Sequence, residues 1–227
     1  MTRLSYGFFC ATFVAGVALA GCSGGSGGGS GGSGGGGSGG TTTVTNFLDL
    51  VPSGAKVPSG WAVDNSNSKT AGMVAATATT EKGVEDLIDG AAADFFAAPN
   101  SPQNFAWQNY VDASLPSAVS STVVGSTLKL YILQMPSADQ CATLYASLLT
   151  ANLYVGNTWT DPTSPVIGSK SRITDSGTDW WINFCKDNYY TEVRMTPSYG
   201  PAPDYALSDP NQKAAAMAFA QAVAGPM

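Results

Sequence analysis

The chain has 227 residues, of which 11% are charged, and its formal net charge at pH 7 is −6. This charged fraction is less than half of the roughly 25% found in average soluble proteins, and the sequence has no run of Lys or Arg that could follow a phosphate backbone, so nucleic acid is excluded as a partner. Histidine is absent, which excludes His-dependent catalytic triads, His-containing zinc sites and imidazole acid–base catalysis.

Residues 1–21 have the pattern of a secretory signal peptide. Arg3 supplies a short basic region, and a mostly apolar run of 13 residues extends from Phe8 to Ala20, within the roughly 7–15 residues of a signal h-region and too short to span a membrane. The segment ends in Leu19-Ala20-Gly21-Cys22, which resembles the lipobox of bacterial lipoproteins. That resemblance implies cleavage before Cys22 and attachment of diacylglycerol and palmitate-type acyl chains to it.

Residues 23–40 contain only Gly and Ser, a composition that predicts a flexible, disordered linker with an end-to-end distance of about 23 Å. Together with the lipidated Cys22 it forms the predicted tether at 22–40, and residues 41–227 form one predicted globular domain. Ser23 follows the cysteine at the place where Asp retains some lipoproteins in the inner membrane. We therefore expect anchoring in the bacterial cell envelope, at the outer membrane, with the membrane as a partner through the lipid.

The first part of the domain contains two predicted strands, at 61–63 and 71–79, followed by a helix. The helix is predicted at 81–97, because apolar residues recur there with helical spacing. Glu85, Asp86 and Asp89 fall on its other side and are interpreted as a solvated acidic face, with a metal or acid–base site as the alternative.

Two further strands and a second helix follow. Strands are predicted at 103–114 and 126–135, and Pro136 ends the second of them. Ser137 and Gln140 have the spacing of a capping box. The next helix therefore begins at Ser137, and its buried stripe consists of Cys141, Leu144, Tyr145, Leu148 and Leu149.

A hairpin over 179–195 and a closing helix complete the domain. Asp187 and Asn188 form the predicted two-residue turn, because both tolerate left-handed backbone. This register places Trp181 opposite Arg194 and gives two faces. One is apolar and the other is mixed, with Trp181, Asn183, Cys185, Tyr190, Glu192 and Arg194. The last helix is predicted from an Asp209 cap and Pro210 to about Ala224.

This order of elements predicts an α+β fold, an antiparallel sheet with about three packed helices in a two-layer or three-layer sandwich. The segments DLIDGAAADFF, LKLYILQMPSADQCATLYASL and NFCKDNYYTEV, with the Ala-rich last helix, resemble a family of uncharacterised bacterial proteins known only as a domain of unknown function. The resemblance extends over most of 47–224, although Asn188 stands where that pattern has Gly. It implies no catalytic residue.

Cys141 and Cys185 are the only cysteines that follow Cys22, and an oxidising envelope favours a disulfide between them. However, Cys185 lies on the mixed face, whereas the helix with Cys141 is expected to cover the apolar face. Either helices cover both faces, or the hairpin register differs, or both thiols stay free. No CxxC spacing is present, so no metal and no cofactor are predicted.

Three functions remain open for the domain. Trp159, Trp181 and Tyr190 could form an aromatic platform that binds a glycan or an envelope protein, or they could be half-buried in the sheet. The lipobox and tether, the absence of His and the lack of a convergent catalytic motif favour a non-catalytic binding or accessory module. The alternative is a glycan-directed envelope hydrolase, which needs two carboxylates about 5–10 Å apart in a cleft. A small-ligand carrier would need an apolar cavity of at least a few hundred Å³, an order of magnitude typical of ligand pockets.

Overall fold

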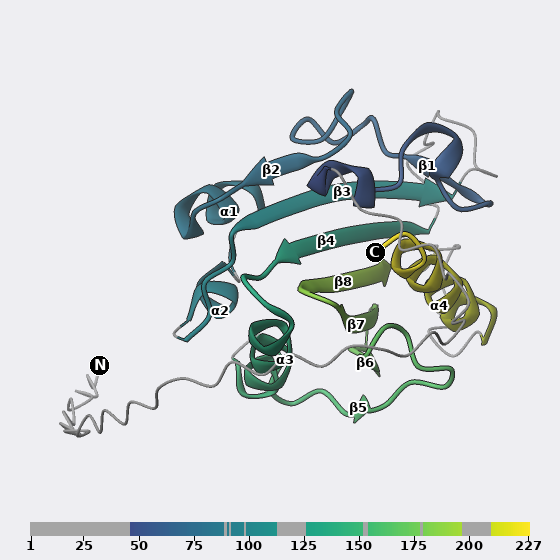
Figure 1. Ribbon diagram of the computed structural model, residues 1–227. Helices are drawn as coiled ribbons and strands as arrows, with labels where there is room; N and C mark the ends of the chain where they lie inside the picture. Colours follow the sequence, from purple (N-terminus) through teal and green to yellow (C-terminus); the bar gives the residue numbers. More distant parts are fainter. Residues whose placement is uncertain are drawn as a thin grey trace, which may run out of the picture. The chain divides into compact units, whose positions relative to one another are not determined.

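The computed structural model describes residues 46–88, 90, 92–97, 99–112, 126–151, 154–177, 179–196 and 210–227, all within the unit Thr41–Met227 (Figure 1). The predicted signal peptide, Cys22, the Gly/Ser tether, Asp89 and Asp209 lie outside these residues. The described elements, in chain order, are η1 (Phe47–Leu50), η2 (Gly54–Lys56), β1 (Trp61–Val63), β2 (Ala76–Ala78), α1 (Glu81–Ile88), α2 (Ala92–Phe96), β3 (Asn104–Asp112), β4 (Thr127–Gln134), α3 (Ala138–Ser147), η3 (Leu148–Thr150), β5 (Trp159–Thr160), β6 (Lys170–Asp175), β7 (Trp180–Lys186), β8 (Tyr189–Thr196) and α4 (Pro210–Ala224).

Eight antiparallel strands form one sheet, in the order β1-β3-β4-β8-β7-β6-β5, with β2 pairing beside β1 along β3 (Figure 1). The β7–β8 hairpin has the predicted register, since Lys186 pairs with Tyr189 and Trp181 pairs with Arg194. Asp187 takes the left-handed conformation at the turn, with φ of 51°. The predicted hairpin is thereby confirmed.

Helices cover both faces of the sheet, and the fold is a three-layer α+β sandwich. Both α3 and α4 contact β7 and β8, yet they belong to separate hydrophobic clusters. The cluster beneath α4 contains Leu130, Ile182 and Val193 of the sheet, and the cluster beneath α1–α3 contains Tyr131, Cys185 and Tyr190. The predicted α+β class is confirmed, in its three-layer form.

The prediction of one continuous helix over 81–97 is wrong. This segment forms two helices, α1 and α2, with Gly90 between them at φ of 110°. This backbone conformation is accessible to glycine and strained for other residues, and it ends a helix. The strand predicted at 71–79 is also shorter, because only Ala76–Ala78 pair with β3.

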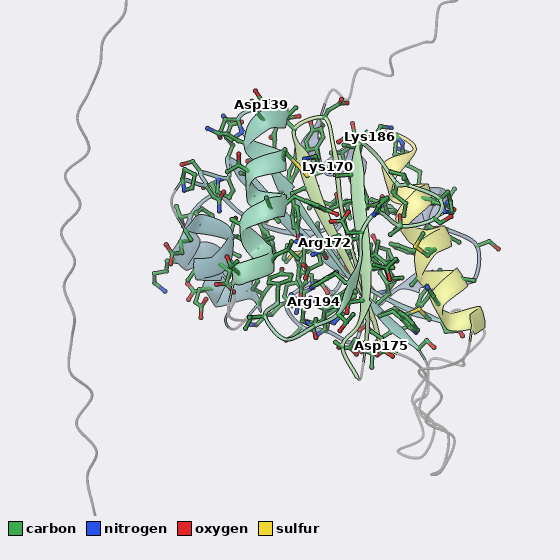
Figure 2. All side chains as sticks on the ribbon, turned by 90° about the horizontal axis from the view of Figure 1, so that it is seen from below. Asp139, Lys170, Arg172, Asp175, Lys186 and Arg194 are labelled. Atoms are coloured by element: carbon green, nitrogen blue, oxygen red, sulfur yellow. A yellow bond between two sulfur atoms is a disulfide. The ribbon has the colours of Figure 1, made fainter. Side chains whose placement is uncertain are left out.

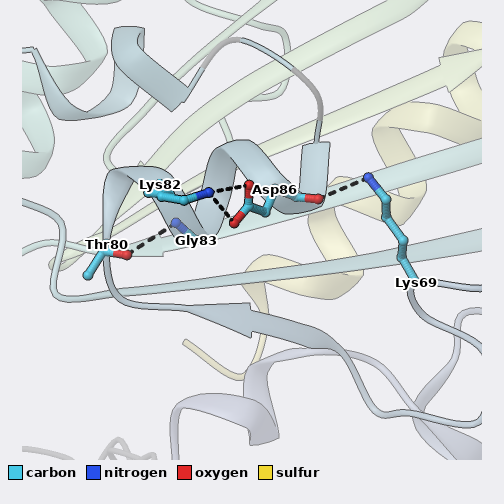
Figure 3. Close-up of polar contacts among 5 residues, drawn as sticks. All are labelled: Lys69, Thr80, Lys82, Gly83 and Asp86. Carbon is cyan, nitrogen blue, oxygen red and sulfur yellow. Dashed lines mark hydrogen bonds and ion pairs between the residues drawn. The ribbon is translucent and has the colours of Figure 1, made fainter.

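The acidic face of α1 is solvated (Figure 3). Lys82 Nζ lies 2.8 Å from both carboxylate oxygens of Asp86, and both side chains are largely exposed. Lys69 donates to the main-chain oxygens of Asp86 and Leu87, and Thr80 Oγ1 accepts from the amide of Gly83. Among the described residues no group of three or more His, Cys, Asp or Glu side chains could hold a metal ion.

The beginning of α3 agrees with the sequence in one half of the capping box. Ser137 is the N-cap, and its hydroxyl oxygen accepts from the amide of Gln140 at 3.2 Å. The reciprocal half is not formed, because the Gln140 side-chain oxygen is buried without a partner. The serine alone therefore caps the helix.

Candidate functional site: an arginine–aromatic cluster beneath α3

A row of polar side chains crosses the centre of the sheet on the face covered by α3. Tyr131 of β4 pairs with Glu192 of β8, Glu192 pairs with Asn183 of β7, and Asn183 pairs with Arg172 of β6. Since directly paired residues share a face, these four side chains line up across four strands. With the rings and the second arginine that surround them they form the arginine–aromatic cluster, which consists of Tyr131, Tyr145, Tyr154, Trp159, Arg172, Trp181, Asn183, Tyr190, Glu192 and Arg194.

Glu192 is the centre of a closed hydrogen-bond network. It is fully buried, and it is the one buried acid among the described residues. The Tyr154 hydroxyl donates to Oε2 at 2.5 Å, the Tyr190 hydroxyl donates to the same oxygen at 3.2 Å, and Arg194 Nε forms an ion pair with Oε1. In the amide orientation that satisfies both of its ends, Asn183 also donates to Oε2, at 3.2 Å, and its oxygen accepts from the Tyr190 hydroxyl at 2.9 Å, so Asn183 and Glu192 share the one proton of that hydroxyl. The acceptor capacity of this carboxylate is therefore used within the protein.

Arg194 is held between its counter-ion and two aromatic rings. Its Cζ atom lies 4.1 Å from the ring centroid of Trp181 and 5.3 Å from that of Tyr131, distances typical of cation–π contacts. Burial is the largest single effect and lowers the pKa of Arg194, but the Glu192 carboxylate together with Tyr154 and Tyr131 outweighs it and raises that pKa above its usual value. Arg194 is thus a paired, structural cation.

Arg172 has similar aromatic contacts but no counter-ion among the residues that the structure describes. Its Cζ lies 4.2 Å from the ring centroid of Tyr145 and 4.9 Å from that of Trp159. The side chain is fully buried, and Nε, Nη1 and Nη2 all lack a hydrogen-bond partner. Both arginines are labelled in Figure 2, which views the sheet with α3 on one side and α4 on the other. The cluster therefore contains one guanidinium whose donors face no acceptor.

The surroundings of Arg172 reach the surface at one edge of the sheet. Continuing the β5–β6 register from Thr160 and Ile173 places Asp161 opposite Arg172. Asp161 is exposed, and its Oδ2 accepts from the Tyr145 hydroxyl at 3.1 Å. Trp159 is half-buried, and its indole N–H is a second buried donor without a partner. Two neighbouring side chains thus present unsatisfied donors close to solvent.

Burial raises the pKa of the tyrosines in and near this face. For Tyr145 burial is the largest cause; the Arg172 charge opposes it, and the Asp161 carboxylate adds to it. Burial likewise raises the pKa of Tyr131 to about 12, and the nearby Arg194 charge again opposes it. The hydroxyls of Tyr131 and Tyr145 therefore remain protonated near neutral pH. Burial also raises the pKa of Tyr110, Tyr154 and Tyr190, whose hydroxyls remain protonated as well.

The predicted aromatic platform of Trp159, Trp181 and Tyr190 is not an open surface. Tyr190 is 0% exposed and Trp181 is 7% exposed, and only Trp159 is half-buried. The prediction of an exposed platform is therefore wrong for Trp181 and Tyr190. Trp181 and Tyr190 are buried because α1–α3 form a layer over this face, which the hairpin pattern had left open.

Cys141 of α3 and Cys185 of β7 form a disulfide across this same face. The sequence left three alternatives open, and the structure agrees with the first. Helices cover both faces of the sheet, and the two cysteines are joined. The bond links α3 directly to the strand that also carries Trp181 and Asn183. The disulfide therefore holds α3 over the cluster.

Two neighbouring hollows lie on the other face, between α4 and the segment before β6. The larger part of this groove has a volume of about 530 Å³, and the smaller part has a volume of about 330 Å³. Both parts are open to solvent, and Gln221 lines both. Lys186 Nζ is engaged there by the main-chain oxygen of Ala224 at 2.6 Å. The two hollows form a shallow groove rather than the enclosed apolar cavity that a carrier would need.

The sequence interpretation did not single out Arg172 or Glu192, although one signal for the arginines was present. In residues 41–227 only Arg172 and Arg194 are arginine, and every other basic residue is lysine. Arginine is the preferred cation for buried pairs and for contact with aromatic rings. No family model matches the chain, and no curated protein and no solved structure matches it either. The family resemblance of the sequence therefore stays a prediction.

Proposed function

We propose that this protein is a lipid-anchored component of the bacterial cell envelope, at the outer membrane, that works as a non-catalytic binding or accessory module. The lipobox ending at Cys22 and the Gly/Ser tether of 23–40 support the anchoring. None of the helices in the described part of the chain has the length and apolar character needed to cross a membrane. A glycan or another envelope protein is the partner that this location offers.

The observation that carries the binding function is the contrast between the two arginines of the cluster. Arg194 is neutralised by Glu192, whereas the donors of the buried Arg172 have no acceptor. A buried donor without a partner is costly to the folded protein and is satisfied when a ligand supplies the acceptor. Such a group is suited to recognition, because arginine stays protonated and transfers no proton near neutral pH.

The alternative of a glycan-directed hydrolase receives no support from the carboxylates. An acid and a base or nucleophile must flank the same bond, and the one buried acid in the described part of the chain, Glu192, is enclosed by Tyr154, Tyr190 and Arg194. Incubation of the purified protein with peptidoglycan tests this directly. We expect no release of reducing ends, and release that is lost in Glu192→Gln would establish the hydrolase instead.

The anchoring is tested by metabolic labelling with an alkyne analogue of palmitate, followed by the mass of the mature N-terminus. Wild type and Cys10→Ala, the matched control within the predicted signal peptide, should be labelled and cleaved. Cys22→Ala should accumulate as unlabelled precursor. Normal labelling and cleavage of Cys22→Ala would exclude the proposed anchor.

A further inference from the structure

We propose that Arg172 anchors a binding site for a small oxyanion group, a carboxylate or a phosphate, beneath α3 at the β5–β6 edge of the sheet. This inference deepens the proposed binding function by naming the chemistry of the ligand. It depends on the side chains around Arg172 and not on the lipid anchor.

In the described part of the cluster the positive charges outnumber the buried negative charges by one. Two guanidinium groups, Arg172 and Arg194, share the face with a single buried carboxylate, Glu192, which forms its ion pair with Arg194. The arrangement is thus short of one negative charge, and the shortage is located at Arg172. Breaking or omitting one partner of a buried ion pair leaves an uncompensated charge, which strongly destabilises a fold.

The aromatic contacts do not remove this deficit. Rings of Tyr145 and Trp159 attract the Arg172 cation through their faces, but a ring face accepts few of the five N–H bonds that a guanidinium offers. Arg194 lies in the same environment, contacts two such rings and in addition forms an ion pair with a carboxylate. Arg172 has the rings without the carboxylate.

Several donors near Arg172 suit an oxyanion rather than a neutral ligand. The indole N–H of Trp159 is buried and unpartnered, and the ring lies 4.9 Å from Arg172 Cζ. The Tyr145 hydroxyl, whose ring lies 4.2 Å from the same atom, is a third donor, now directed to Asp161. Carboxylate and phosphate oxygens are the acceptors that arginine binds most strongly, through charge-assisted and often bidentate hydrogen bonds.

Asp161 is the competing acceptor within the chain. It is exposed and directly follows Thr160 of β5, whose partner on β6 is Ile173, and its Oδ2 accepts from the Tyr145 hydroxyl rather than from the guanidinium. A ligand oxyanion would approach Arg172 from this edge of the sheet, and the negative charge of Asp161 would repel it. Asp161→Asn should therefore tighten oxyanion binding, whereas an internal Arg172–Asp161 pair would make that variant unstable.

The experiment is a thermal-unfolding titration of the purified, full-length mature protein with sodium phosphate, sodium sulfate or sodium acetate, each against sodium chloride at equal ionic strength. Bound ligand should raise Tm in proportion to the logarithm of its concentration once that exceeds Kd, by about 5–10 °C at 100 times Kd for a domain of this size. Phosphate and sulfate also stabilise proteins in general, so the specific part is the shift that exceeds the shift of Arg172→Met. Acetate distinguishes a carboxylate site from a site for tetrahedral oxyanions.

Lys170→Met is the matched control, because Lys170 lies two residues before Arg172 on the same strand and the same face but is exposed. We expect Lys170→Met to keep the logarithmic, ligand-dependent Tm shift and Arg172→Met to lose it. In chloride alone, Arg172→Met should unfold at or above the wild-type Tm, since it removes an unpaired buried charge.

Three outcomes would overturn the proposal. One is a folded wild type whose Tm shift with each of the three anions is no larger than that of Arg172→Met. Another is a shift that persists unchanged in Arg172→Met. The third is a double-mutant cycle in which Asp161 and Arg172 stabilise each other and no anion binds. None of these outcomes alters the labelling of Cys22, so failure of this site and failure of the anchoring are distinguishable.

Discussion

Glu192→Gln tests whether the buried carboxylate holds the arginine–aromatic cluster together. The substitution keeps the shape of the side chain and removes its charge, so that Arg194 loses the counter-ion bonded to Oε1. The new amide also presents an NH₂ group to the hydroxyls of Tyr154 and Tyr190, which now donate to Oε2. Both effects disfavour the folded state.

Removing one partner of a buried ion pair costs about 3–5 kcal/mol. The Arg194 side chain is 15% exposed, so some solvent reaches it and the lower part of that range applies. For a domain of 150–250 residues each kcal/mol lowers Tm by about 2–4 °C, and we expect a decrease of about 6–12 °C. Urea unfolding followed by far-UV circular dichroism gives the free energy directly.

The matched variant is the double substitution Glu192→Leu with Arg194→Met. Replacing a buried ion pair by apolar side chains of similar size is often neutral or stabilising, so the double variant should be more stable than Glu192→Gln. A Glu192→Gln protein within about 1 kcal/mol of wild type, a typical single-mutation effect, would refute the assigned role of Glu192.

Three further predictions follow from individual contacts. Cys141→Ala with Cys185→Ala should lower the free energy of unfolding by about 4 kcal/mol, the loop-closure entropy for a separation of 44 residues, and should abolish the effect of reductant on urea unfolding. Gly168→Ala should destabilise more than Gly177→Ala, because both glycines have positive φ but only at Gly168 would a Cβ collide, with the carbonyl oxygen of Cys185; equal Tm values would contradict this. Between pH 10 and 12 stability should fall, because the Tyr131 pKa is raised to about 12 in the folded protein, which holds a proton that the unfolded chain has lost; a fall of equal size in Tyr131→Phe would contradict this.

Local sequence patterns predicted most of the sheet because their physical causes are local. The turn at Asp187 depends on two residues that tolerate left-handed backbone, and the strand alternation beside it determines which side chains share a face. The start of α3 depends on the Ser137 hydroxyl and one amide. Pairing of distant strands, such as β4 with β8 in the centre, follows from none of these signals and was not predicted.

The division of 81–97 into α1 and α2 shows where local spacing misleads. Val84 and Phe95 are both buried, as the helical spacing predicted, yet they belong to different helices. Apolar spacing survives a break because each short helix buries its own side against the sheet. Gly90 at φ of 110° is the residue that allows the break, and glycine in a helix interior already costs up to about 1 kcal/mol relative to alanine.

The arginine–aromatic cluster was missed because burial of the mixed face depends on which face α3 covers. The pattern of β7 and β8 assigns Cys185, Glu192 and Arg194 to one face, and that face was interpreted as partly open. The disulfide contains the missing information, since a bond from Cys141 to Cys185 requires α3 to lie over the mixed face. Had the bond been taken as the premise, burial of Glu192 would have followed, together with its need for a cation. Arg172 lies on that face because β6 pairs with β7, and no sequence pattern predicted that pairing. The shortage of one anion therefore became visible only in the structure.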